Sequence, residues 1–311
     1  MQRIGSRLAT AALVSAGAAT GIGYLAPWWP KADVPNQFTP FILVAAVVGL
    51  VLLAFESRKL ATHRFAQLAL GVGLGGVAAI NTASLLTALA TAAGAEQGPT
   101  ESLTVVSFNV WSKNQRLDEV SHWLLNQNAD VIVLQEMTPK NRDPIKRELA
   151  ATYPHVYDCG CSDIVMSSRR AWIAAGGQPR TDEQPALSWM TLVDRNGREV
   201  RVVGLRPTYI KNPARYAAHY DWLVRNAGTL GDRVILAGDF NAAPWSWQMM
   251  RFAAASGLRR HGTYAASWPS FLPVVLIDNV LTTPDIRSVS FRIGPFLGSD
   301  HLPLVAIVAL P

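Results

Sequence analysis

The most informative stretch of the chain is Gly238-Asp239-Phe240-Asn241-Ala242-Ala243-Pro244. It follows the apolar run 234–237, which is typical of a buried strand. Asp239 and Asn241 are two residues apart at the expected strand end, so their side chains can point into one cleft. Gly238 permits a sharp turn, and Pro244 prevents the strand from continuing. A carboxylate that orients water beside an amide that donates to phosphate oxygens suits phosphate chemistry. The same residues are also typical of a simple Asx-type turn.

Long uncharged segments occupy the N-terminal part of the chain. A chain of 311 residues has room for one large domain or two smaller ones, and 50% hydrophobic with 16% charged residues favours a protein that lies partly in a membrane. Each uncharged segment is long enough to cross about 30 Å of hydrocarbon as a helix of roughly 20 residues. The sequence therefore predicts a membrane region at residues 1–95 with three transmembrane helices at about 8–29, 38–55 and 65–93.

Two other interpretations of these segments remain open. The first segment is rich in Ala and Gly and resembles a signal peptide, although two further apolar segments follow it. All three segments could also be buried helices of a soluble protein. The predicted linker covers residues 96–102, and the soluble domain is predicted at 103–311.

Lysine and arginine residues predict the orientation of the membrane region. Arg3 and Arg7 precede the first segment, and Arg58, Lys59 and Arg64 lie in the second loop, whereas the first loop balances Lys31 against Asp33. The positive-inside tendency therefore places the N-terminus in the cytoplasm and the domain after residue 96 outside it. The net charge of +6 is explained largely by these flanking residues and gives little support for nucleic-acid binding.

The two cysteines, Cys159 and Cys161, are separated by one residue. A compartment outside the cytoplasm permits a disulfide, but a bridge over so short a loop is tight. Two cysteines do not make a zinc site, and the sequence assigns them no role.

The soluble domain begins with a strand–helix–strand pattern. The expected strand 103–108 ends at Asn109, an amphipathic helix with Leu117, Val120, Trp123 and Leu124 on one face follows, and the strand 131–134 ends just before Glu136. A βαβ unit brings both strand ends to one edge of a sheet, so Asn109 and Glu136 are expected to lie close together.

Further polar residues follow other expected strands. An Asn-Gly turn at 196–197 predicts a hairpin, and Asp278 comes directly after the apolar run 274–277. Asp300 and His301 precede the last strand, 304–310. Carboxylates and histidines are usually only solvated, but several of them at one sheet edge are typical of phosphate and metal chemistry.

These residues, in this order, resemble the endonuclease/exonuclease/phosphatase superfamily, whose members include deoxyribonucleases, neutral sphingomyelinases and inositol polyphosphate 5-phosphatases. The resemblance covers Leu103 to Leu310 and excludes the membrane region. The matching segments are Ser107-Phe108-Asn109-Val110-Trp111, Leu134-Gln135-Glu136, Gly238-Asp239-Phe240-Asn241, Ile277-Asp278 and Ser299-Asp300-His301-Leu302-Pro303-Leu304.

The resemblance implies an α/β fold: a four-layer α+β sandwich of two packed mixed β-sheets flanked by helices, with the site at one end. It implies that Glu136 binds Mg²⁺ or Mn²⁺, with Asn109 and Asp300 as ligands or orienting groups. It also implies three catalytic roles. Asp239 positions the attacking water, Asn241 binds phosphate oxygens, and His301, oriented by Asp278, contacts the phosphate or moves a proton.

The sequence departs from the family pattern at two positions. The family's usual His after the strand 201–204 is replaced, and Arg206 comes nearest to its place. An arginine can hold a phosphate, but its pKa is too high for ordinary proton transfer. Asn279 stands where related bacterial members often have His, which is expected to matter little. His219 lies in an expected helix, where a structural role is favoured.

The sequence-based hypothesis is a membrane-anchored, metal-dependent phosphoesterase outside the cytoplasm. Membrane spans before this domain look like those of bacterial membrane members of the superfamily, which implies a bacterial cell-membrane location and a lipid-linked phosphate or pyrophosphate as substrate. Anchoring raises the effective concentration of lipid head groups near the site. The alternatives are a secreted-side nuclease and a catalytically weak phosphate-binding module. For the nuclease, the candidate groove residues are Trp245, Trp247, Arg251, Arg259 and Arg260.

Overall fold

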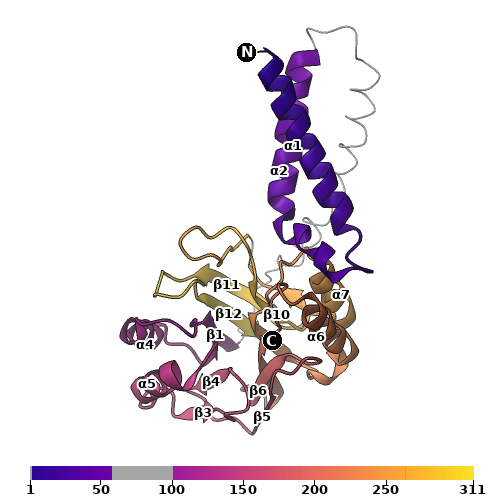
Figure 1. The fold of residues 1–311 in the computed structure, drawn as a ribbon. Coiled ribbons are helices and arrows are strands. Elements are labelled where there is room, and N and C mark those ends of the chain that lie inside the picture. Colours follow the sequence, from indigo (N-terminus) through magenta and orange to yellow (C-terminus); the bar gives the residue numbers. More distant parts are fainter. Residues whose placement is uncertain (1, 58–100, 263) are drawn as a thin grey trace. The chain divides into compact units, whose positions relative to one another are not determined.

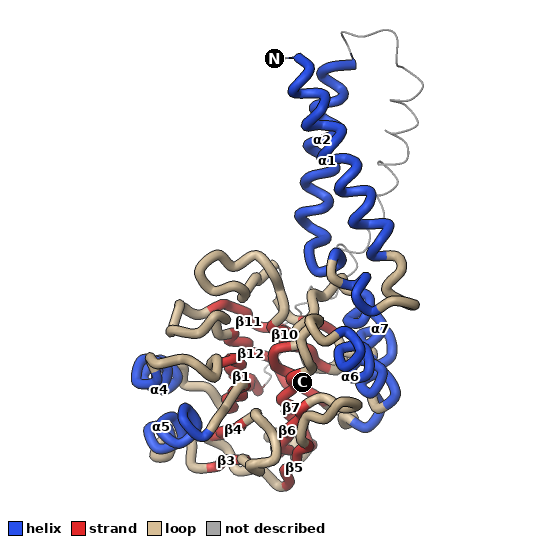
Figure 2. Tube along the Cα trace, in the orientation of Figure 1, coloured by secondary structure: helices blue, strands red, loops and turns tan. Residues whose placement is uncertain are grey.

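The computed structural model describes residues 2–57, 101–262 and 264–311. Two compact units are present. One contains the N-terminal helices together with residues 244–247, and the other contains the remaining described residues. Figure 1 and Figure 2 show the elements of each unit.

The N-terminal unit contains two packed helices, α1 (Gln2–Gly23) and α2 (Thr39–Ser57), joined through the 3₁₀ turns η1 (Pro30–Asp33) and η2 (Pro35–Phe38). A Cβ on Gly49 would lie 2.5 Å from Leu13 Cγ, so this glycine allows the helices to approach closely. At the end of α1, Asn36 Nδ2 donates to Gly23 O at 3.2 Å.

The described part of this unit has one helical stretch long and apolar enough to cross a membrane, Pro30–Leu52, which overlaps the predicted span at 38–55 over residues 38–52. The predicted span at 8–29 is wrong in extent, because α1 ends at Gly23 and its apolar part, Leu8–Gly23, is shorter than a span. The predicted span at 65–93 lies outside the described residues.

Two mixed six-stranded sheets form the second unit. In the first sheet β1 and β2 are parallel and the other pairs antiparallel, whereas in the second sheet only β7 and β8 are parallel. The first sheet has the order β11 (Arg287–Ile293), β12 (Leu304–Leu310), β1 (Glu101–Asn109), β2 (Val131–Gln135), β4 (Val165–Ser168), β3 (His155–Tyr157). The second has the order β5 (Ala174–Gln178), β6 (Ala186–Val193), β7 (Glu199–Arg206), β8 (Val234–Asp239), β10 (Asp278–Thr282), β9 (Arg259–Arg260).

Helices cover the outer faces of both sheets. Helices α4 (Leu117–Asn126) and α5 (Pro139–Leu149) accompany the first sheet, and α6 (Pro213–Arg225) and α7 (Trp247–Ser256) the second; a short 3₁₀ turn, η3 (Ala227–Thr229), follows α6 (Figure 1). One apolar cluster lies between the sheets and two more lie beneath the helices. The predicted four-layer sandwich is confirmed, and so is the β1–α4–β2 unit with parallel strands.

Gly238 was predicted to permit a sharp turn, but the structure shows a different role for it. It lies inside β8, where a Cβ would come within 2.0 Å of Leu205 O on the neighbouring strand β7. Only glycine fits at this position, because the clash would be with backbone that cannot move aside.

The structure also corrects several boundaries. Asp278 begins β10 instead of following a strand, and because β10 runs antiparallel to β8 it pairs with Asp239 at the same sheet edge. Strand β1 begins at Glu101, inside the predicted linker. Cys159 and Cys161, which had no assigned role, form a disulfide.

The turn between β6 and β7 is held by one carboxylate. Asp194, with a side chain only 1% exposed, accepts from the N–H groups of Asn196 and Arg198 and pairs with Arg233 at 2.8 Å. Burial alone would raise the pKa of Asp194, but these donors lower it from 3.8 to about 2. The folded state is therefore stabilised when this group is ionised.

We expect Asp194→Asn to lower the free energy of unfolding at pH 7 by about 1–2 kcal/mol, since the full shift corresponds to somewhat more and the turn lies near solvent. The stabilisation is present above pH 3.8 and is lost as the pH falls towards 2. Urea unfolding of the wild type and the variant at pH 7 and near pH 2 measures this stabilisation. Asp182→Asn is the control, because the Asp182 side chain is 81% exposed. Equal effects of the two variants would contradict the assignment.

Candidate active site

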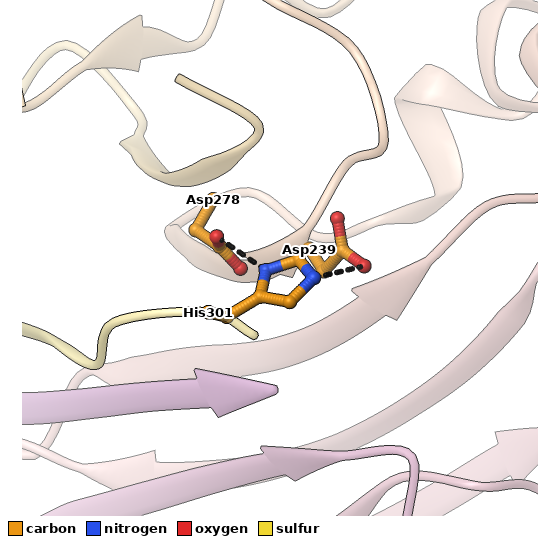
Figure 3. Close-up of side chains that lie close together, drawn as sticks. All are labelled: Asp239, Asp278 and His301. Atoms are coloured by element: carbon orange, nitrogen blue, oxygen red, sulfur yellow. Dashed lines mark hydrogen bonds and ion pairs between the residues drawn. The ribbon is translucent and has the colours of Figure 1, made fainter. Parts of the chain in front are cut away.

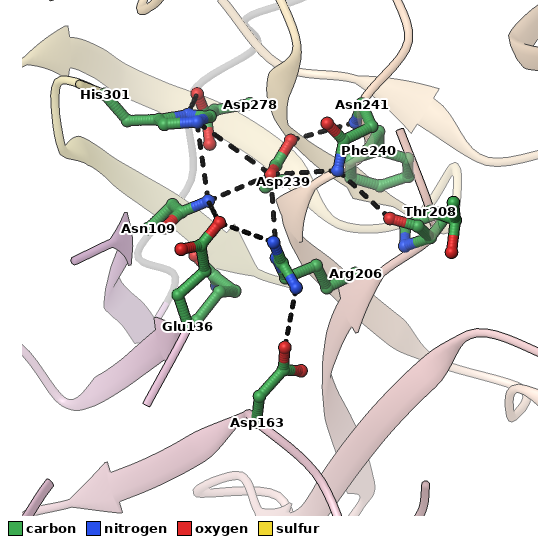
Figure 4. Close-up of polar contacts among 12 residues, drawn as sticks. Asn109, Glu136, Asp163, Arg206, Thr208, Asp239, Phe240, Asn241, Asp278 and His301 are labelled. Carbon is green, nitrogen blue, oxygen red and sulfur yellow. Dashed lines mark hydrogen bonds and ion pairs between the residues drawn. The ribbon is translucent and has the colours of Figure 1, made fainter. Parts of the chain in front are cut away.

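Polar side chains from both sheets meet at one edge of the second unit (Figure 4). Asn109 ends β1 and Glu136 directly follows β2, so the first sheet supplies both. The second sheet supplies Asp239 at the end of β8 and Asp278 at the start of β10. His301 comes from the loop before β12. The predicted convergence of these five residues is therefore present.

Asn109 joins the contributions of the two sheets. Its Nδ2 donates to Asp239 Oδ2 at 3.0 Å and to Glu136 Oε1 at 3.2 Å, which uses both of its N–H groups. Its Oδ1 accepts from the N–H of Trp111. Asn109 therefore fixes the position of two carboxylates that come from different sheets.

Asp278 and His301 form a buried pair (Figure 3). His301 Nδ1 lies 2.8 Å from Asp278 Oδ2, which also accepts from Ser267 Oγ. The other ring nitrogen, Nε2, lies 4.0 Å from Asp239 Oδ2. Burial alone would lower the pKa of His301, but Asp278 and Asp239 outweigh it and raise the pKa to about 9. The imidazole is therefore held in its protonated form at neutral pH.

Asp239 is buried at the centre of the site, with a side chain 1% exposed. Burial raises its pKa to about 6, while His301 and Arg206 act in the opposite direction. Oδ1 accepts from the N–H of Asn241, and Oδ2 accepts from the side chains of Asn109 and Asn241. A carboxylate with a pKa just below neutrality suits the removal of a proton from water.

Arg206 lies among three carboxylates. Its Nη2 donates to Glu136 Oε1 at 2.5 Å and its Nη1 to Asp163 Oδ2 at 2.6 Å, while Nε is 3.9 Å from Asp239 Oδ2. Burial would lower the pKa of Arg206, but Asp163, Glu136 and Asp239 outweigh it and raise the pKa. Burial would raise the pKa of Glu136, but Arg206 lowers it. This guanidinium compensates the negative charge of the site.

Asn241 and Asp300 have the remaining predicted roles. Asn241 Nδ2 donates to Asp239 Oδ2 and to the Pro207 carbonyl, both at 3.0 Å, so both amide N–H groups are already used. Binding a phosphate oxygen would require one of these bonds to exchange. Asp300 Oδ2 accepts weakly from Trp268 Nε1 at 3.4 Å.

Three residues at the site have left-handed backbone conformations that are uncommon outside glycine. They are Trp111 at φ 64°, Glu136 at φ 59° and Asn241 at φ 51°. Such positions cost free energy and occur preferentially where function requires a fixed side-chain direction. Here they turn the chain sharply just beyond β1, β2 and β8.

The residues present fit a hard divalent cation. Asp300 Oδ1 is buried and has no hydrogen-bond partner within the described chain. When all its ionisable side chains are charged, the site carries two more negative than positive charges. The carboxylates are Glu136, Asp163, Asp239, Asp278 and Asp300, and the cations are Arg180, Arg206 and His301. Oxygen donors of this kind are those that Mg²⁺ and Mn²⁺ prefer.

A second possible ligand group consists of Asp239, Asp278 and His301, whose ligand atoms all lie within 4.8 Å of one another. A histidine must lose its proton to bind a metal. Because the neighbouring carboxylates raise the pKa of His301, this group is better suited to hold a proton than a metal. Glu136, which the sequence predicts as a ligand, is the other candidate for holding the metal.

Sequence reasoning missed Asp163 and Arg180. Asp163 pairs with both Arg206 and Arg180, and thereby positions the guanidinium that contacts Glu136. The available signal was a polar residue two positions before the buried strand β4, which pairs with β2. His219 has the expected structural role, because its Nδ1 accepts from the Thr208 N–H and its Nε2 lies 2.9 Å from the Thr181 carbonyl.

The second unit is similar to several solved structures. A mannosyl-6-phosphatase from Bacteroides thetaiotaomicron matches with a TM-score of 0.57 and 17% identity over 66% of this chain and 99% of that one. D. rerio TDP2 complexed with a single-strand DNA product matches at 0.54 and 16%, over 67% and 99%. Sphingomyelinase C from Streptomyces griseocarneus matches at 0.50 and 15%, over 68% and 100%. At these identities the likeness concerns the fold.

No curated protein matches the chain significantly. The model of the endonuclease/exonuclease/phosphatase family matches residues 106–301, which is more than half of the sequence and includes every side chain of the site described above. The chain therefore belongs to the endonuclease/exonuclease/phosphatase family.

Proposed function

We propose that this phosphoester hydrolase is a membrane-anchored, divalent-metal-dependent enzyme that acts outside the cytoplasm on lipid-linked phosphates or pyrophosphates. The observation that carries the proposal is the convergence of Asn109, Glu136, Asp239 and the Asp278–His301 pair at one sheet edge. The family membership accounts for the hydrolase activity.

The chemistry is divided among the side chains. Asp239 orients the attacking water and accepts its proton, since its carboxylate is buried and fixed by Asn109 and Asn241. His301, held by Asp278, donates from Nε2 to a phosphate oxygen or to the leaving oxygen. Arg206 supplies positive charge for the phosphate. Each group is positioned before substrate arrives, which lowers the cost of ordering the transition state.

A divalent cation held by Glu136, Asn109 and Asp300 would neutralise the phosphate and stabilise the leaving oxygen when bound. Enzymes of this family usually use such a metal. Arg206 would share Glu136 with this cation, because the guanidinium already contacts Oε1.

Two features support a location at the outer face of the cell membrane. The helical stretch Pro30–Leu52 has the length and composition of a membrane span. The Cys159–Cys161 disulfide favours an oxidising compartment, since disulfides are uncommon in the cytosol. With the lysine and arginine distribution of the N-terminal loops, these features favour a catalytic unit outside the cytoplasm.

A nuclease is the alternative enzyme, but two arginines proposed for its groove are occupied. Arg251 pairs with Asp221 at 2.8 Å, and Arg260 is 6% exposed and donates to the carbonyls of His261 and Gly262. Arg260 is therefore too buried to contact a phosphate backbone, and Arg251, although 31% exposed, already has a carboxylate partner.

A weak phosphate-binding module is the alternative outside enzymes, and Arg206 in place of the family's histidine is its support. The variant Arg206→His distinguishes an efficient enzyme from a weak phosphate-binding module. A large gain in turnover would indicate that the wild-type site lacks a catalytic group. Unchanged turnover in an already active enzyme would indicate that Arg206 has another task.

The experiment that tests the function measures phosphate or nucleotide release by the full chain in detergent. Lipid pyrophosphates, soluble phosphodiesters and plasmid DNA are supplied with Mg²⁺, with Mn²⁺ or with chelator. We expect metal-dependent release that is fastest with the lipid pyrophosphates. Fastest release from plasmid DNA would favour the nuclease, and binding without release would favour the binding module.

A further inference from the structure

An uncharged loop lies between β9 and β10, close to the site in sequence and in space. From Tyr264 to Ile277 the chain contains no charged residue. At its tip, Phe271 is 84% exposed and Leu272 is 61% exposed. We call residues 264–277 the tip loop. Two adjacent large apolar side chains held in water are costly unless something covers them.

The backbone of the tip loop is largely hydrogen-bonded within the protein. The N–H groups of Val274 and Val275 donate to the Trp268 carbonyl, and that of Leu272 donates to the Pro269 carbonyl at 3.0 Å. Tyr264 donates its hydroxyl to the Val274 carbonyl at 2.8 Å. A loop that enters an apolar medium must satisfy its backbone in this way, because that medium offers no hydrogen bonds.

The tip loop is hydrogen-bonded directly to residues 299–300, which precede His301. The N–H of Ser270 donates to the Asp300 carbonyl at 2.8 Å, and its hydroxyl donates to the Ser299 carbonyl at 2.6 Å. Ser267 donates to the Asp278 carboxylate that holds His301. Phe271 and Leu272 are therefore held in a fixed position relative to the histidine of the site.

We infer that Phe271 and Leu272 insert into the lipid surface and place the site at the level of phosphate head groups. The occupant is a bilayer, because the chain carries an apolar stretch of membrane-span length and the loop combines an uncharged sequence with a largely hydrogen-bonded backbone. Two side chains bury too little area for a stable protein interface. The inference deepens the proposed function, on which it rests, by specifying a substrate presented in a membrane.

The first test places a single fluorescent label at the tip. Phe271→Cys in the full chain, reconstituted in phospholipid vesicles, is labelled with an environment-sensitive dye, and Asn196→Cys in the β6–β7 turn is the exposed control. We expect lipids with brominated acyl chains to quench the label at 271 and aqueous iodide to quench the label at 196. Quenching of both labels by iodide would overturn the inference. Shielding of 271 from both quenchers would indicate a protein occupant and overturn it equally.

The second test compares two kinds of substrate. For the double variant Phe271→Ser/Leu272→Ser, we expect KM for a lipid phosphate in vesicles to rise about tenfold, with hydrolysis of a water-soluble nitrophenyl phosphoester unchanged. Val289→Ser on β11 is the control, since Val289 is an exposed apolar residue outside the tip loop. Equal losses on both substrates would contradict a lipid contact. If the wild type hydrolyses neither substrate, the proposed function fails, and the fluorescence experiment still decides the lipid contact.

Discussion

Asp239→Asn is expected to reduce turnover about 10³-fold or more, because it removes the group that takes the proton from water. The amide keeps the shape of the side chain, and Asn109 and the Asn241 N–H still lie beside it. The fold should therefore survive. Initial rates of phosphate release, with circular dichroism as a check of folding, measure the effect.

Asp221→Asn is the matched control for this substitution. Asp221 lies on α6 and pairs with Arg251 at the surface, with a side chain 43% exposed. We expect it to leave turnover within about twofold, since exposed ion pairs contribute little. A rate for Asp239→Asn similar to this control would remove Asp239 from the mechanism.

Arg206→Met is expected to lower the free energy of unfolding by about 3–5 kcal/mol, since it leaves buried carboxylates without their cation. Glu136 loses its ion pair at 2.5 Å and Asp163 loses one of its two arginines. Thermal unfolding of the full chain, in metal-free buffer and with saturating Mg²⁺, measures the loss. Mg²⁺ should stabilise Arg206→Met more than the wild type, because the metal then faces no competing guanidinium at Glu136.

Arg215→Met provides the comparison for Arg206→Met. Arg215 also pairs with an aspartate, but that partner, Asp182, is 81% exposed. We expect less than about 1 kcal/mol of destabilisation from this variant. An equally small loss for Arg206→Met would show that the carboxylates of the site do not depend on its charge.

The residues of the site that follow strands could be predicted from the sequence because strand ends have a strong local signal. Asn109, Glu136 and Asp239 each lie within two residues of the end of a short, largely apolar run, and parallel pairing of β1 with β2 brings the first two together. Asp278 was identified as a site residue although its strand begins there. The reason is that β10 runs antiparallel to β8, which brings a start and an end to the same edge.

Other features depended on contacts that no local pattern records. Asp163 belongs to the site only because Arg206 reaches it from the other sheet at 2.6 Å. Strand β5, with the sequence Ala-Ala-Gly-Gly-Gln, lacks the β-branched and aromatic residues that mark a strand, and pairing with β6 alone defines it. Gly238 is required by the approach of Leu205, which becomes visible only once β7 and β8 are paired.

The N-terminal unit illustrates the limit of composition as a guide. The uncharged window between Arg7 and Lys31 has ample length for a span, but the helix within it ends at Gly23, where Asn36 donates to the last carbonyl. Absence of charge therefore did not determine where the helix stops.

The central claim is that this site delivers water to a phosphoryl group, and isotope incorporation tests it most directly. The full chain is incubated with Mg²⁺ and a lipid pyrophosphate in water enriched in ¹⁸O, and both phosphoryl products, the lipid phosphate and the inorganic phosphate, are analysed by mass spectrometry. The account predicts one ¹⁸O atom per molecule hydrolysed, carried by one of the two products, with the wild type and not with Asp239→Asn. Absence of ¹⁸O from both products, or equal incorporation by both proteins, would contradict it.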